Sequence, residues 1–133
     1  MSAALGAVQG GPRLILRLEG AALAIGAAFF YWRLGGSWLL FVVLFLAPDL
    51  SFLAYLRSPR VGAIGYNALH STIGPLALLA IGAGTDRSLC EWVALIWLAH
   101  IGFDRAVGYG LKYADAFNAT HLGPIGRKDR GEL

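Results

Sequence analysis

The sequence WLAHIGFDRAVGYGLKY, residues 97–113, decides how this chain is interpreted, because it carries charged groups inside an apolar run. Its polar members are His100, Asp104, Arg105, Tyr109 and Lys112. Charged side chains are costly in hydrocarbon, so they usually pair with one another and mark a functional site. On a helix, His100 and Asp104 lie on one face, and Arg105 and Tyr109 form the adjacent stripe. The stretch predicts where the protein works.

Composition indicates a membrane protein. Of the 133 residues, 57% are hydrophobic and 14% are charged, whereas a soluble domain has about 25% charged residues. The net charge of +3 does not indicate nucleic-acid binding, because the basic residues fall at expected helix ends, where membrane topology explains them. The single cysteine, Cys90, excludes an intramolecular disulfide and a thiolate metal cluster.

Four apolar segments cover most of the chain, and each has the roughly 20 residues that a helix needs to cross a membrane. We expect them at residues 14–32, 37–56, 61–83 and 89–111. The short breaks between them contain turn-forming residues, which makes neighbouring helices antiparallel. The predicted fold is an all-α, integral membrane, up-down four-helix bundle over residues 14–112. A mobile tail is expected at 1–13 and a polar tail at 113–133.

The distribution of basic residues predicts the orientation. Nine of the eleven Lys and Arg residues fall on the side of the N-terminus, and only Arg33 and Arg87 fall on the other. Because cytoplasmic loops are rich in Lys and Arg, both termini are expected to be cytoplasmic. The predicted location is the inner membrane of the cell, with membrane lipids as partners and a homo-oligomer as a further possibility.

Several polar residues on different segments share one depth. At a rise of about 1.5 Å per residue, Asp49, His70, His100 and Asp104 lie about 10–17 Å from the cytoplasmic edge. Asn67 and Tyr66 lie one helical turn closer to that edge. Such a layer predicts a site, although polar groups in membrane bundles also serve as interhelical hydrogen bonds worth about 1 kcal/mol or less.

Two prolines lie beside this layer. Pro48 directly precedes Asp49, and Pro75 follows His70 by about one turn. Each interrupts the backbone hydrogen bonds of its helix, so kinks that open a cavity are one interpretation. The other is that prolines are simply tolerated in membrane helices.

The motifs together resemble a known family. They are RLEG (17–20), FLAPDLSFLAYL (45–56), VGAIGYNALHS (61–71), IWLAHIGFDRAVGYGLKY (96–113) and THLG (120–123). This set resembles the small bacterial membrane proteins grouped as domain of unknown function 4260, over about residues 14 to 123. The resemblance implies a four-helix integral membrane protein and no assigned activity.

A second resemblance is to membrane-bound metal-dependent hydrolases. Those proteins pair a Pro-Asp motif with a His-Ser motif and a later helix bearing His and Asp. Here the corresponding residues are Pro48-Asp49, His70-Ser71 and His100 with Asp104. The chain departs from that pattern at Ser51, where the family usually has a second acidic residue, and it lacks the His-Arg pair that precedes His-Ser.

The first functional hypothesis is a metal-dependent hydrolase acting on a lipid-like substrate. Two imidazoles with one or two carboxylates suit a zinc-like divalent ion, which activates water and polarises a carbonyl or phosphoryl oxygen. His70, His100 and Asp104 are the expected ligands, and Asp49 is a ligand or the general base. The expected substrate-binding residues are Tyr66, Asn67, Arg105, Tyr109 and Lys112. Of these, Arg105 and Lys112 would hold an anionic headgroup.

Two alternatives use the same residues. In an oligomeric carrier, channel or proton relay, the polar layer forms part of a pathway across the membrane. In a non-catalytic protein, His70 and His100 bind a haem between them, or the layer only holds helices together.

Overall fold

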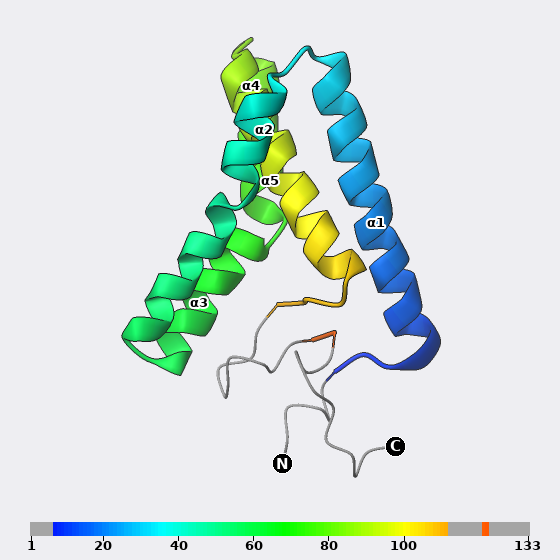
Figure 1. Ribbon diagram of the computed structural model, residues 1–133, viewed down its shortest axis with the longest axis vertical. Helices are drawn as coiled ribbons and strands as arrows, with labels where there is room; N and C mark the ends of the chain where they lie inside the picture. Colours follow the sequence, from blue (N-terminus) through cyan, green and yellow to red (C-terminus); the bar gives the residue numbers. More distant parts are fainter. Residues whose placement is uncertain (1–6, 112–120, 123–133) are drawn as a thin grey trace.

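The computed structural model describes residues 7–111 and 121–122 (Figure 1). Within that part of the chain, six helical elements form four segments that reverse direction one after another. The first segment is α1 (Gly10–Arg33), and the last is α5 (Ser88–Ala106). The second and third segments are each broken. They consist of α2 (Trp38–Phe45) with the 3-10 helix η2 (Ala47–Leu56), and of α3 (Pro59–His70) with α4 (Ile73–Gly84).

Pro48 explains the break in the second segment, which was expected to be continuous over 37–56. Proline has no N–H to donate, and its ring clashes with the carbonyl four residues earlier. The helix therefore ends at Phe45, and the Asp49 N–H bonds to the Leu46 carbonyl at 3.1 Å, a 3-10 spacing. From there the chain continues as η2 to Leu56.

Pro75 explains the break in the third segment, expected over 61–83. The carbonyl that its ring would clash with belongs to Ser71, and Ser71 has left the helical region, with φ −82° and ψ 142°. Helix α3 therefore ends at His70. Helix α4 starts at Ile73, so Pro75 lies in its first turn, where a missing N–H leaves no hydrogen bond unmade.

Helix α5 ends five residues earlier than the expected position 111. Gly108 adopts φ 98°, a left-handed conformation that favours glycine. The Gly108 N–H bonds to the Arg105 carbonyl, and the Tyr109 N–H bonds to the Asp104 carbonyl at 2.7 Å. These two bonds form a Schellman motif, which satisfies the last carbonyls and stops the helix at Ala106. The sequence predicted that Tyr109 would extend the helical stripe of Arg105. This prediction is wrong, because Tyr109 lies beyond the end of the helix.

Helix α5 lies at the centre of the arrangement and packs against α1, α4 and α2, whereas α3 packs mainly on η2 (Figure 1). Glycines allow α1 and α5 to approach closely. A Cβ atom added at Gly102 would lie 2.6 Å from the backbone of α1, at Gly20 and Ala24. The main apolar cluster joins α1 and α5. It contains Ala27, Tyr31, Leu95, Ile96, Leu98 and Ala99.

Three helical segments are long and apolar enough to span a membrane: Gly10–Arg33, Trp38–Leu56 and Pro59–Gly84. Large apolar side chains on them are exposed, as expected where a protein contacts lipid, and Leu39 and Ile73 are each more than 70% exposed. Four spans were expected. Helix α5 is not among the three, because it carries Glu91, Asp104 and Arg105. It is the most buried helix. The finding indicates a multi-pass helical membrane protein.

The described ends of the chain meet beside the start of α1. The Val8 N–H bonds to the His121 carbonyl at 2.8 Å, and the Leu111 N–H bonds to Nδ1 of the His121 imidazole at 2.8 Å. Leu122 is fully buried, and its carbonyl accepts a hydrogen bond from Arg13. The expected tails lie mostly in residues 1–6, 112–120 and 123–133, outside the described part of the chain.

Candidate metal centre

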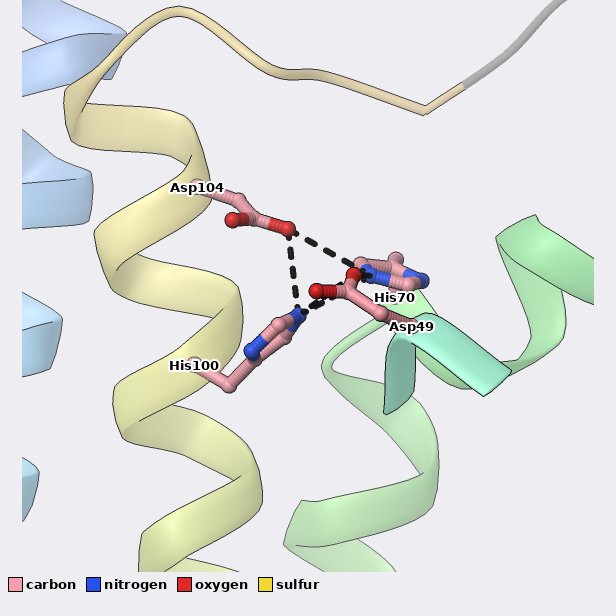
Figure 2. Close-up of side chains that lie close together, drawn as sticks. All are labelled: Asp49, His70, His100 and Asp104. Carbon is pink, nitrogen blue, oxygen red and sulfur yellow. Dashed lines mark hydrogen bonds and ion pairs between the residues drawn. The ribbon is translucent and has the colours of Figure 1, made fainter. Parts of the chain in front are cut away.

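Four side chains from three segments converge on one point (Figure 2). His70 Nε2 and His100 Nε2 are 3.1 Å apart. Asp49 Oδ1 lies 3.5 Å from His70 Nε2 and 3.3 Å from His100 Nε2. Asp104 Oδ2 lies 3.4 Å and 3.2 Å from the same two atoms. The depth count grouped these residues, and the structure adds the helix rotations that bring their side chains together.

The breaks in the second and third segments position two of the four residues. Asp49 follows Pro48 in the first turn of η2, and His70 is the last residue of α3. His100 and Asp104 lie one turn apart on α5, as their spacing predicted. The two imidazoles are buried, the side chain of Asp104 is 13% exposed, and that of Asp49 is 38% exposed. Asp49 is therefore the member that a molecule from outside reaches most easily.

Contacts around the cluster fix the orientation of both imidazoles. His70 Nδ1 lies 2.9 Å from the Tyr66 carbonyl, so this nitrogen carries the proton and donates it, which leaves the Nε2 lone pair facing the cluster when the ring is neutral. The Tyr66 ring stacks on the His70 ring, with centroids 3.8 Å apart. The ring of Phe45 packs edge-on against His100 at 5.3 Å.

His100 contains a buried polar atom without a well-formed hydrogen bond in the described part of the chain, its Nδ1. The backbone carbonyl of Phe45 is close enough to interact with the His100 imidazole. This carbonyl belongs to the last residue of α2, and the N–H that would bond to it in a continuous helix, that of Asp49, bonds to Leu46 instead. With its proton on Nδ1, His100 also directs the Nε2 lone pair into the cluster.

The arrangement fits a divalent cation held by nitrogen and oxygen ligands. Ligand atoms about 2.0–2.1 Å from a tetrahedral zinc ion are about 3.3–3.4 Å apart. The five separations measured here range from 3.1 to 3.5 Å, and all four ligand atoms lie within 4.8 Å of one another. This group can therefore hold a metal ion.

Charge favours the same conclusion. With neutral imidazoles the cluster carries the two negative charges of Asp49 and Asp104. Within the described residues, neither carboxylate pairs with a Lys or Arg side chain. Two carboxylates this close repel one another in a low-dielectric environment. A divalent cation would remove that repulsion and satisfy all four ligand atoms at once.

The residues expected to bind substrate have different positions. Tyr66 is buried and supports His70 rather than facing an open surface. Asn67 is partly buried on α3, and its carbonyl accepts the Ser71 N–H. Arg105 lies beside the cluster and donates from Nη2 to the His70 carbonyl at 3.3 Å. Tyr109 is 43% exposed beyond the end of α5, and Lys112 lies outside the described residues.

Sequence reasoning missed two aromatic residues beside the centre. Phe45 contacts His100, and Trp97 donates its indole N–H to the Leu69 carbonyl at 2.6 Å. That carbonyl has no helical partner because the Ile73 N–H bonds to the Ser71 hydroxyl at 3.3 Å. The spacing of Trp97 and His100, three residues apart on one helix, was the available signal.

Comparison with known proteins identifies the family and no activity. The model of a domain of unknown function, DUF4260, matches residues 13–125, which confirms the family resemblance drawn from the motifs. Comparisons with curated proteins and with solved structures gave no match.

Proposed function

Because the chain belongs to the DUF4260 family, whose function is unknown, we propose a function from its own residues. The protein is a membrane hydrolase that binds one zinc-like divalent cation and cleaves a lipid-like substrate. The observation that carries the proposal is the set of five separations of 3.1–3.5 Å among two imidazole nitrogens and two carboxylate oxygens. They match five of the six separations among the four ligand atoms of a tetrahedral zinc-like ion.

The four residues differ in accessibility, and this suggests different roles. His70, His100 and Asp104 are the three most buried and would hold the cation. Three protein ligands leave the fourth position of a catalytic zinc site for a water, and Asp49 Oδ1, which lies at that position here, would turn aside to admit it. A cation held there activates water and polarises the carbonyl or phosphoryl oxygen of the substrate. Asp49, the most exposed member, would be the general base.

The hydrolysis then needs two proton transfers, and Asp49 makes both. A water oxygen forms a bond to the acyl or phosphoryl centre, and Asp49 accepts the proton that this water loses. The bond from that centre to the leaving oxygen or nitrogen breaks with its electron pair. Asp49 passes the proton to the leaving atom, so the carboxylate is regenerated at the end of the cycle.

Orientation in the membrane is part of the proposal. His100 and Asp104 lie in the last two turns of α5, and the count of basic residues favours the cytoplasmic side for that end of the helix. Helix α5 would cross the membrane as the fourth span, shielded from lipid by α1, α2 and α4. Arg105, which bonds to the His70 carbonyl, would hold an anionic headgroup.

Two alternatives fit the geometry less well. Haem needs its axial nitrogens on opposite sides of the iron, about 4 Å apart, with the macrocycle between them. The two Nε2 atoms here are 3.1 Å apart and have two carboxylates beside them. A transport pathway needs polar groups along its length, whereas the described cavity next to the cluster is lined only by apolar residues.

Metal content is the decisive test. The protein would be purified in mild detergent, without chelators or a histidine tag, and its metals measured by elemental mass spectrometry. We expect close to one zinc, manganese or iron per chain, lost in the double variant His70→Ala/His100→Ala. His121→Ala, which removes the remaining histidine of the chain, is the matched control and should keep the metal.

The same preparations test catalysis. Asp49→Asn should retain the metal and lose the hydrolysis of a chromogenic acyl ester, because it keeps the shape of the residue and removes the base. Metal-free wild-type protein, or unchanged metal in the double histidine variant, would contradict the proposed centre. Full hydrolysis by Asp49→Asn would contradict the role given to Asp49.

A further inference from the structure

A cavity of about 210 Å³ lies between the broken second and third segments and α5. Its lining comes from α2, η2, α3 and α5 and consists entirely of apolar residues, including Pro48, Leu69 and Trp97. We call this space the chain cavity. Water is poorly held in a cavity with such a lining, because it finds no hydrogen-bonding partners there.

The chain cavity adjoins the four-residue cluster on each of its elements. Pro48 directly precedes Asp49 in η2, and Leu69 directly precedes His70 in α3. On α5, Trp97 and Val93 lie three and seven residues before His100, and the helix rise of about 1.5 Å per residue makes these axial distances about 5 and 10 Å. The lining residues therefore begin within about one helical turn of the cluster, and the cavity extends from there toward the Ser88 end of α5.

Three kinds of group follow one another along α5. The apolar lining residues Val93, Ile96 and Trp97 come first. His100 and Asp104 of the cluster come next, and Arg105 follows beside the His70 carbonyl. An amphiphile placed along this line would have its hydrocarbon in the cavity, its carbonyl at the cluster and any anionic group near Arg105.

We propose that the chain cavity binds the acyl chain of the substrate, so that the scissile bond is the ester or amide bond at the end of that chain. This inference rests on the proposed hydrolase function and names its substrate class. A methylene group is about the size of a water molecule, about 30 Å³, so a volume of about 210 Å³ has room for roughly seven methylenes. The substrate class is therefore a medium-chain acyl ester or amide.

Straight-chain alkyl hydroxamic acids test the inference, because the hydroxamate group chelates a zinc-like ion and the tail length can be varied. The dissociation constants of acetohydroxamate through dodecanohydroxamate would be measured on the zinc-loaded protein by calorimetry. Partition into the micelles, measured without protein, is subtracted. Each added methylene should tighten binding by about fourfold. The gain in binding affinity with each added methylene should stop at about seven methylenes.

A bulkier lining residue should shorten the preferred chain. Ala47→Phe places a ring in the chain cavity and should move the end of the gain three to four methylenes earlier, with acetohydroxamate affinity unchanged. Val93→Phe makes the same test from α5 in case the first variant does not fold. Leu50→Phe is the matched control on η2, because Leu50 is 67% exposed and lies outside the cavity.

The outcomes separate the two proposals. Acetohydroxamate binding without a gain for longer chains, or an unchanged length limit in folded Ala47→Phe and Val93→Phe, overturns the chain cavity alone. If no hydroxamate binds the zinc-loaded protein, the proposed hydrolase site fails, and the inference built on it fails with it.

Discussion

Helix α5 packs against an unbroken helix on one side and against interrupted helices on the other. Toward α1, the contact is between two unbroken helices, where Gly20 and Gly102 bring the backbones together and Arg17 of α1 donates to the Ala106 carbonyl at the end of α5. Toward the second and third segments, α5 faces helices interrupted at Leu46 and at Ser71–Thr72. The polar cluster lies on this second side (Figure 2).

The difference suggests a division of roles. A regular helix pair fixes the position of His100 and Asp104 through close packing, because interlocked backbones leave little freedom of rotation. The interrupted segments lose regular hydrogen bonds, but each interruption places a residue of the cluster beside it, Asp49 after Pro48 and His70 before the extended Ser71. The regular α1–α5 pair positions His100 and Asp104, and the two interrupted segments position Asp49 and His70, so that the four side chains meet.

The largest expected effect comes from disrupting the close contact between α1 and α5. In Gly102→Leu the new side chain would meet the α1 backbone, since even a Cβ atom would lie 2.6 Å from it. We expect a loss of about 3 kcal/mol in the free energy of unfolding, measured by thermal unfolding in detergent. Gly26→Leu on α1 is the control, because a Cβ atom there meets nothing within 4 Å. Equal melting temperatures for the two variants would contradict the close approach of α1 and α5.

The second largest expected effect is a loss of stability when the metal is removed from the cluster. A ligand present at about 100 times its dissociation constant stabilises the folded state by about 2.7 kcal/mol. A chelator should therefore lower the melting temperature of the wild-type protein and leave that of His70→Ala/His100→Ala unchanged. The cluster would not be a metal site if the chelator shifted both proteins equally.

Restoring a regular backbone at Pro48 should weaken catalysis. Pro48→Ala allows the helix to continue past Phe45, which turns Asp49 away from the cluster and should reduce the hydrolysis rate about 100-fold while the metal is retained. The chromogenic acyl ester assay, beside elemental mass spectrometry, measures this. Pro59→Ala is the control, because Pro59 opens α3, where its missing N–H removes no helical bond. Unchanged hydrolysis in Pro48→Ala would show that the break does not position Asp49.

The smallest expected effect is at the closing contact of the chain ends. Burial, together with Arg105, lowers the pKa of His121 from its ordinary value of about 6.5. The folded state therefore binds this proton less readily than the unfolded state. The contribution of His121 to stability is complete above about pH 6.5 and is lost as the pH falls through the lowered value.

Hydrogen exchange detects this change. Protonated Nδ1 cannot accept the Leu111 N–H, so protection of that amide should fall at low pH after correction for intrinsic exchange rates. In His121→Asn the amide oxygen can still accept this bond, and it does not titrate, so protection should be independent of pH. Equal pH dependence in both proteins would assign the effect to another group.

The sequence was sufficient for the apolar segments and for the members of the cluster. Segment length and composition predicted four apolar segments, and three of them are long and apolar enough to span a membrane. Counting residues from the loops predicted that Asp49, His70, His100 and Asp104 lie at one depth, because helical rise converts sequence position into height. The family resemblance was also confirmed.

The remaining features depend on contacts that no local pattern contains. Depth does not determine how a helix is rotated, so the convergence of four side chains required tertiary packing. Pro48 and Pro75 were recognised as possible kinks, but not as the ends of separate helices. Tyr109 was placed on the helix because Gly108 fits a helical stripe as well as a left-handed cap, and only the backbone of Gly108 decides between them.

The 3-10 form of η2 has a mechanical consequence. Ten residues in this form are about 5 Å longer than the same residues in an α-helix, and runs of more than about four are uncommon because the hydrogen bonds are poorer. Relaxation of the segment to an α-helix would shorten it and turn Asp49 by about 40° relative to Ala47. Bilayer thickness acts on the length of membrane segments. A change in the length of this segment would therefore also change the direction of one carboxylate.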